Sequence, residues 1–194
     1  MTVTIQAVTE RAKNVHAIAN QLNNECIVYW DERRISPFDS FKQMLDISVK
    51  DYRLHLQDDV ILADNLQDYF LTLKSYMLAE DIHVFSLFAP NRKEFIEAYE
   101  SGKHIVEFKN FLWLQAVIFS KTAIEEMRHY IKNYGEIKHD DVFVRDYLKK
   151  YNRKAYVHLP SLVQHNVWLG LVVGHRNDKR RMSKLFSKNY VNEL

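Results

Sequence analysis

Apolar residues recur along the chain with two different periods. A period of two, or a short apolar run between polar residues, is typical of a strand, whereas apolar residues at i, i+3, i+4 and i+7 are typical of a helix. The residues Val15, Ile18, Ala19 and Leu22 follow the helical spacing. We predict strands over residues 2–8, 26–30, 52–56, 82–88, 113–120 and 155–158. We predict helices over about residues 9–22, 38–48, 65–77, 92–100, 121–133 and 140–152, the third of them capped by Asp64.

The alternation of strands and helices predicts an α/β fold with a mostly parallel central sheet flanked by helices. The chain has 194 residues, of which 47% are hydrophobic and 27% charged, so it suits one domain with a buried core. No repeat or low-complexity segment divides it, and we treat residues 1–194 as a single domain.

Cysteine content and apolar runs point to a soluble protein of a reducing compartment, and we expect a cytoplasmic location. Cys26 is the single cysteine, which excludes a disulfide framework and a cysteine zinc site. The apolar runs at residues 112–119 and 167–173 are too short to span a bilayer, and we expect no membrane segment. The N-terminus lacks the basic region and long apolar run of a signal peptide.

Glycine content excludes the common phosphate-binding loops. The four glycines are Gly102, Gly135, Gly170 and Gly174, and they form neither GxGxxG nor GxxxxGK[ST]. A nucleotide would therefore need other groups to hold its phosphates.

Positive charge is concentrated near the C-terminus. The net charge is +2, but residues 174–188 hold six Lys/Arg against one Asp, so the rest of the chain is net acidic. Such a segment is either a solvated tail or an anion site for phosphate, nucleotide or nucleic acid.

An acidic pair follows the strand predicted at residues 52–56. In open α/β sheets ligands bind beyond the carboxyl ends of strands. Asp58 and Asp59 are adjacent carboxylates that repel each other, and Mg²⁺ or Mn²⁺ would neutralise them. The alternative is a loop with two solvated acids, or a helix N-cap.

Two further polar positions have both a structural and a functional interpretation. Asp140 and Asp141 precede a helix, where they either cap it or supply a general base. His165 lies just past the last predicted strand, where it is either a structural histidine or a metal ligand.

Three motifs in this order resemble a known family. They are His55-Leu56-Gln57-Asp58-Asp59-Val60, then Asp140-Asp141 with a helix reaching Tyr147-Leu148, then Pro160-Ser161-Leu162-Val163-Gln164-His165. The chain resembles small GT-A-fold glycosyltransferases of bacterial or phage type over most of its length. The resemblance implies that residues 1–110 mainly bind a nucleotide-sugar, that 111–173 mainly bind the acceptor and carry catalysis, and that 174–194 form a lid.

The resemblance also implies a site for the donor's diphosphate. Asp59, Asp58 and His165 would bind Mn²⁺ or Mg²⁺, with Gln57 beside them, and the ion would bridge the phosphates of a UDP-sugar or related donor. Because Gln-Asp-Asp departs from a strict DxD motif, either aspartate could be the direct ligand.

Further roles follow from the same resemblance. Asp141 would be the catalytic base of an inverting transfer, a role that a retaining enzyme would not require, and Asp140 would bind the sugar or the acceptor. The expected donor contacts are Arg11, Asp31, Lys42, Arg176, Arg181 and Ser183, with Lys179 and Arg180 as further candidates.

The acceptor and two rival functions stay open. The acceptor is a glycan or a hydroxymethylated base in phage DNA, which would have to be extruded from a duplex. A non-catalytic nucleic-acid-binding module would tolerate Asn at positions 58 and 59. A metal-dependent phosphohydrolase or nuclease would cleave phosphate esters without transferring a sugar.

Overall fold

A sheet of seven strands runs through the part of the chain that the structure describes. The computed structural model describes residues 1–23, 25–32, 36–135, 139–169 and 181–190. The strand order is β2-β1-β3-β7-β5-β8-β6. These strands are β1 (Thr2–Ala7), β2 (Ile27–Trp30), β3 (Tyr52–Gln57), β5 (Val84–Ser86), β6 (Ile105–Glu107), β7 (Ala116–Ser120) and β8 (Ala155–His158).

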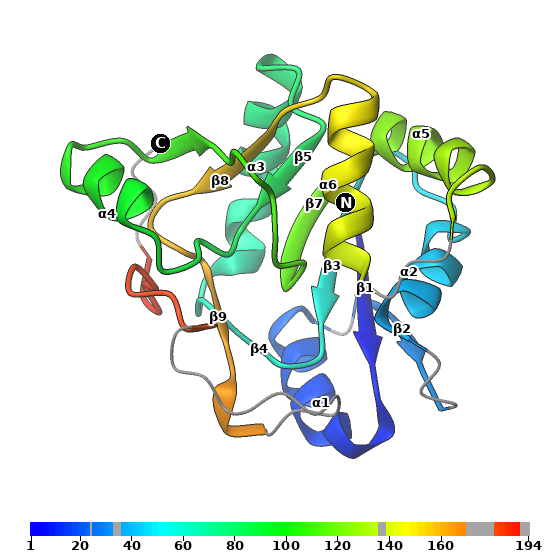
Figure 1. Ribbon diagram of the computed structural model, residues 1–194. Helices are drawn as coiled ribbons and strands as arrows, with labels where there is room; N and C mark the ends of the chain where they lie inside the picture. Colours follow the sequence, from blue (N-terminus) through cyan, green and yellow to red (C-terminus); the bar gives the residue numbers. More distant parts are fainter. Residues whose placement is uncertain (24, 33–35, 136–138, 170–180, 191–194) are drawn as a thin grey trace.

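The strand directions confirm a mostly parallel sheet. β1 is parallel to both β2 and β3, and β5 is parallel to β8. β7 lies antiparallel between β3 and β5, and β6 is an antiparallel edge strand on β8. The carboxyl ends of β1, β2 and β3 therefore meet at one edge, together with the start of β7 (Figure 1).

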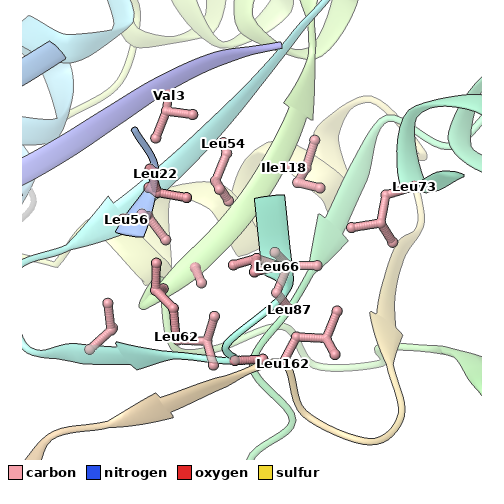
Figure 2. Packing of buried hydrophobic residues seen from close by; sticks show 14 of the residues in the cluster. Val3, Leu22, Leu54, Leu56, Leu62, Leu66, Leu73, Leu87, Ile118 and Leu162 are labelled. Carbon is pink, nitrogen blue, oxygen red and sulfur yellow. The ribbon is translucent and has the colours of Figure 1, made fainter. Parts of the chain in front are cut away.

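Helices cover both faces of this sheet and enclose two apolar cores (Figure 1). Helices α1 (Ala12–Gln21) and α3 (Leu66–Ala79) contribute to the core on one face, which Figure 2 shows around Leu54, Leu56 and Ile118. The core on the other face includes residues of α2 (Pro37–Leu45), α4 (Lys93–Glu100), α5 (Lys121–Ile131) and α6 (Asp140–Lys150). Two 3-10 turns complete the elements, η1 (Thr9–Arg11) and η2 (Val167–Leu169).

A second, two-stranded sheet lies beyond the carboxyl edge. β4 (Val60–Leu62) pairs antiparallel with β9 (Val163–His165), which places Val60 opposite His165. Neither strand is predicted from the sequence, nor is β6, because each has three residues and depends on a partner distant in the chain.

Several predicted element bounds differ from the structure: the strand predicted at 82–88 covers only Val84–Ser86, and the helix predicted at 38–48 ends at Leu45. The strand predicted at 113–120 begins at Ala116, because Trp113 has a φ of 80°, which a strand does not allow. Asp64 does not cap α3: Asn65 is its N-cap residue, and no side chain makes the capping hydrogen bond.

The stretch of residues 181–190, which includes the described end of the basic segment, packs against the body of the protein. Its backbone pairs with Ser161, where the Ser161 N–H donates to the Leu185 carbonyl at 3.0 Å. The Tyr190 ring packs on Tyr69 and His158, and the Asp64 N–H donates to the Lys188 carbonyl. This part of the segment is therefore an ordered element beside β9. Among the described residues, no helix has the length and apolar character needed to cross a membrane.

Candidate active site

Asp58 is held at the end of β1 by two donors. The Val8 N–H donates to Asp58 Oδ2 at 2.7 Å, and Arg11 Nη1 donates to Asp58 Oδ1 at 2.5 Å. The Asp58 side chain is buried, and burial raises its pKa, although Arg11 and the Val8 N–H oppose this rise. The two solvated acids considered above are excluded, because Asp58 and Asp59 are 5% and 7% exposed. The N-cap alternative fails as well, since β4 follows them.

Helix α1 fixes the backbone of this acidic pair. Asn14 Nδ2 donates to the carbonyl oxygens of Asp58 at 2.6 Å and Val60 at 3.1 Å. Because Asn14 follows Arg11 by three residues, both side chains lie on the side of the helix that faces the β3–β4 turn. One helix start thus positions both the carboxylate and the backbone of the pair.

Asp59 contacts the histidine that the sequence singles out. His165 Nε2 donates to Asp59 Oδ2 at 3.0 Å, and Arg11 Nη1 lies 3.0 Å from the same oxygen. The Asn166 N–H donates to the Asp59 carbonyl at 2.6 Å. Burial raises the pKa of Asp59, but the contact with His165 and the charge of Arg11 outweigh it and lower the pKa overall. Asp59 is therefore an ionised carboxylate at neutral pH.

Gln57 connects the pair Asp58–Asp59 to the pair Asp140–Asp141. Gln57 Nε2 donates to Asp140 Oδ2 at 3.3 Å, across 83 positions of the chain. Asp140 Oδ1 accepts the Asp141 N–H at 2.9 Å. Burial, and next the charge of Asp141, raise the pKa of Asp140 to about 7. His139 is the N-cap residue of α6, but Asp140, the first helical residue, accepts an N–H of the first turn, so Asp140 stabilises the helix start as the capping interpretation expects.

Asp141 is partly exposed and faces the loop before β7. Its Oδ2 accepts the Trp113 N–H at 3.3 Å. The guanidinium of Arg181 lies over the Trp113 ring at 5.5 Å, and the charge of Arg181 also acts on Asp59. Arg181 therefore acts on Asp59 through its charge and packs on the residue whose N–H contacts Asp141.

The other predicted donor contacts have different environments. Asp31 is buried at the end of β2, where its Oδ2 accepts the Ser40 hydroxyl at 2.8 Å. Lys42 is exposed on α2, away from these hydrogen bonds. Ser183 is buried, and its hydroxyl accepts the Leu185 N–H, which is a structural role. Arg176 lies outside the described residues, as do Lys179 and Arg180.

Asp59 and His165 each keep one buried polar atom that a metal ion could contact. Asp59 Oδ1 and His165 Nδ1 are buried and have no hydrogen-bond partner among the described residues. A carboxylate oxygen and an imidazole nitrogen both suit Mn²⁺. The described residues contain no cluster of three or more His, Cys, Asp or Glu that could hold a metal, so water and donor phosphates would complete its coordination.

Three residues of this site have no assigned role in the sequence analysis. Asn14 and Trp113 act through contacts between distant segments, and Trp113 also needs a positive φ that the sequence does not reveal. Gln164 is part of a quoted motif, and its Oε1 accepts the N–H groups of His165 and Ser183. Its place in that motif, directly before His165, is the signal that could have identified it.

Comparisons with known proteins support the fold. No protein-family model and no curated protein sequence matches the chain. The crystal structure of A197 from STIV is similar with a TM-score of 0.51 and 15% identity, over 84% of each chain. A glycosyltransferase involved in the glycosylation of the major capsid of PBCV-1 has a TM-score of 0.53 and 11% identity, over 93% of this chain and 97% of that one. At these identities the likeness concerns the fold: this α/β fold, with its mostly parallel central sheet flanked by helices, is one that a solved glycosyltransferase shares over nearly its whole length.

Proposed function

We propose that this protein is a metal-dependent glycosyltransferase that moves a sugar from a nucleoside-diphosphate donor, a UDP-sugar first among the candidates, to an acceptor hydroxyl. The observation that carries the proposal is the convergence of three distant motifs. Gln57 contacts Asp140, and Asp59 contacts His165, at the carboxyl edge where α/β folds bind ligands. The fold shared with a solved glycosyltransferase supports the same proposal.

In this proposal Asp59 and His165 hold Mn²⁺ or Mg²⁺. The bound ion would supply Lewis-acid stabilisation for negative charge on the leaving diphosphate. Asp58 acts differently, since both of its oxygens are engaged by Arg11 and the Val8 N–H. We assign Asp58 to positioning Arg11, and Asp59 to direct metal contact.

The two aspartates at the start of α6 have separate roles in this proposal. Asp141 is partly exposed and accepts the proton of the acceptor hydroxyl, while Asp140 stays buried and fixes the start of the helix through the Asp141 N–H. Arg181, whose guanidinium lies over the Trp113 ring, is the described basic residue that we assign to contact with the diphosphate. A nucleotide phosphate is thereby held without a glycine loop.

Thermal-shift measurements with UDP-, GDP- and CDP-sugars, with and without Mn²⁺, test the donor. A ligand at one hundred times its dissociation constant stabilises the folded state by about 2.7 kcal/mol. We expect Mn²⁺-dependent stabilisation by one donor class, lost in Asp59→Asn and retained in the exposed control Glu80→Gln. Asp58→Asn should lower the melting temperature without ligand. The absence of stabilisation by every nucleotide would overturn the proposal.

Asp141→Asn separates catalysis from donor binding. The variant should bind the donor as the wild type does, because the Asp141 side chain contacts the loop at Trp113 rather than the Asp59 site. Transfer should fall by about 10²-fold or more with the loss of the general base. The transfer rate is measured by release of the nucleoside diphosphate, with glycans and hydroxymethylated duplex DNA tested as acceptors. Cleavage of phosphate esters without sugar transfer would instead indicate a phosphohydrolase.

A further inference from the structure

A basic pocket lies along α6, toward the end of the helix opposite Asp141. It has a volume of about 350 Å³ and is lined by the end of β6 with the loop that follows it, by the C-terminal half of α6 and by residues 152–155, which lead into β8. Its base includes the buried apolar residues Phe108, Leu148 and Ala155, and the Phe108 N–H donates to the Ala155 carbonyl at 2.7 Å. Its charged lining residues are Glu107, Lys109, Arg145, Lys149, Arg153 and Lys154.

Neighbouring carboxylates neutralise three of these five cations. Arg153 pairs with Glu126, Lys154 with Glu107, and Arg145 with Asp146. The remaining two, Lys109 and Lys149, are exposed and form no ion pair with any described residue. They come from the two walls of the pocket. The negative end of the α6 dipole is offset by Lys149 and Lys150 in its last turn.

The loop wall of the pocket is rigidly built. Arg92 donates to the carbonyls of Lys109 at 3.3 Å and Asn110 at 3.4 Å, and its guanidinium lies 5.3 Å from the centre of the Phe108 ring. Asn110 has a φ of 53°, which turns the chain at this point. Lys109 therefore projects from a backbone that is fixed before any ligand binds.

Both walls of the pocket lead to the candidate catalytic base. On α6, Arg145 and Lys149 follow Asp141 by four and eight residues, which places the three on one side of the helix. The loop wall continues along the chain to Trp113, whose N–H donates to Asp141. A molecule whose hydroxyl reaches Asp141 can thus extend along α6 into the pocket.

We propose that this pocket binds a phosphate-bearing sugar of the acceptor glycan, so that the enzyme acts on an anionic acceptor. The inference rests on the proposed function, which it deepens by naming the class of acceptor. The volume is at the small end of the range of ligand pockets, which suits a sugar phosphate. Duplex DNA would need a far wider contact surface. Lys109 and Lys149, which take part in none of these ion pairs, supply the charge-assisted hydrogen bonds for the phosphate.

Amide chemical-shift titrations with glucose 6-phosphate, and with glucose for comparison, test the pocket without donor or metal. The variant is Lys109→Ala/Lys149→Ala, and the matched control is Lys50→Ala/Lys132→Ala, two exposed lysines outside the pocket. We expect glucose 6-phosphate to shift the amides of Lys109, Asn110 and Lys149, and its affinity to fall about tenfold in the variant only, as expected for lost charge-assisted contacts. Glucose should bind more weakly to every form.

Equal affinity of the variant and the wild type for glucose 6-phosphate, or no shift at the pocket, would overturn the proposal. Duplex DNA that binds more weakly to the variant, with no effect of glucose 6-phosphate, would overturn it in favour of nucleic acid. The donor assay with Mn²⁺ is run on the same proteins. Failure of the donor assay alone refutes the glycosyltransferase, and with it the role of the pocket as an acceptor site. An intact donor response with an unresponsive pocket refutes the pocket alone.

Discussion

Asp140 and Asp141 are neighbours in the chain but have different environments. Asp140 is buried and contacts Gln57 and the start of its own helix, whereas Asp141 is partly exposed beside Trp113. Burial raises the pKa of Asp140 to about 7 and keeps its carboxyl away from a bound substrate, whereas a substrate can reach the partly exposed carboxyl of Asp141. At the residue scale, burial therefore gives the two aspartates different roles, a structural one for Asp140 and a chemical one for Asp141.

The Asp140→Asn substitution tests the raised pKa of Asp140. Its pKa of about 7 in the folded state exceeds the ordinary 3.8, so between pH 4 and 7 the folded protein binds more protons than the unfolded one. The contribution of Asp140 to wild-type stability should therefore fall as the pH rises through this window, by an amount on the order of 4 kcal/mol. Asn carries no charge and should remove that loss.

Urea unfolding at pH 4 and pH 8 measures the effect. We expect Asp140→Asn and wild type to be similar at pH 4, and the variant to be the more stable at pH 8. Glu80→Gln, a change of an exposed carboxyl at the end of α3, is the control and should keep the pH dependence of the wild type. A stability difference that does not change with pH would contradict the prediction.

At the element scale, β9 holds the described end of the basic segment in place. Gln164 Nε2 donates to the Ser183 carbonyl at 3.0 Å, and its Oε1 accepts the Ser183 N–H at 2.8 Å. The Gln164 side chain thus pairs with a backbone position as a neighbouring strand would. Because His165 follows directly, the strand that carries the candidate metal ligand also anchors Arg181.

The Gln164→Ala substitution should release this segment. Removing the amide leaves the buried N–H and carbonyl of Ser183 without these partners, which costs about 1–3 kcal/mol. Limited trypsin digestion under native conditions should then cleave faster after Arg181 and Lys184. Gln67→Ala on α3 is the control and should leave the cleavage rate unchanged. Unaltered cleavage in Gln164→Ala would show that other contacts suffice to hold the segment.

At the scale of the whole molecule, β3 lies between the two apolar cores, and its side chains are apolar on one face and polar on the other. Leu54 and Leu56 belong to the core formed with α1 and α3. Arg53 and His55 face the other side, where Arg53 donates to the Met44 carbonyl and His55 meets the Phe41 ring edge-on at 5.2 Å. Neither ring nitrogen of His55 has a partner among the described residues. Burial, and next the charge of Arg53, lower the pKa of His55 to about 3.

Acid should therefore destabilise the fold partly through His55. Its pKa in the folded state lies below the ordinary 6.5, so the unfolded chain binds the extra proton and stability is lost as the pH falls below 6.5. Between pH 7 and pH 4 this amounts to about 3 kcal/mol. His55→Leu should remove that part of the loss, while the buried His158 keeps its own share.

Denaturation curves from pH 7 to pH 4 measure this pH dependence. His16→Leu, an exposed histidine on α1, is the control and should follow the wild type. If His55→Leu declines with acid as steeply as the wild type, His55 is not the group responsible.

The sequence alone determined the fold class and the main strands and helices, because periodicity reports which face of an element is buried. It also determined which residue types could carry the chemistry: the pairs at 58–59 and 140–141, and His165. Those predictions needed only local information, such as a strand followed by acids or a helix that begins with them. The predicted metal, donor and lid roles stay predictions, and part of the lid lies outside the described residues.

Only the tertiary structure decided how these groups divide their roles. Asp58 and Asp59 are equivalent in the sequence, but Val8 and Arg11 engage the first and His165 contacts the second. The short strands β4, β6 and β9 exist because partners more than 40 residues away complete their hydrogen bonds. Burial, the pairing of distant strands and a positive φ at Trp113 are properties of the packed chain, and no pattern of neighbouring residues encodes them.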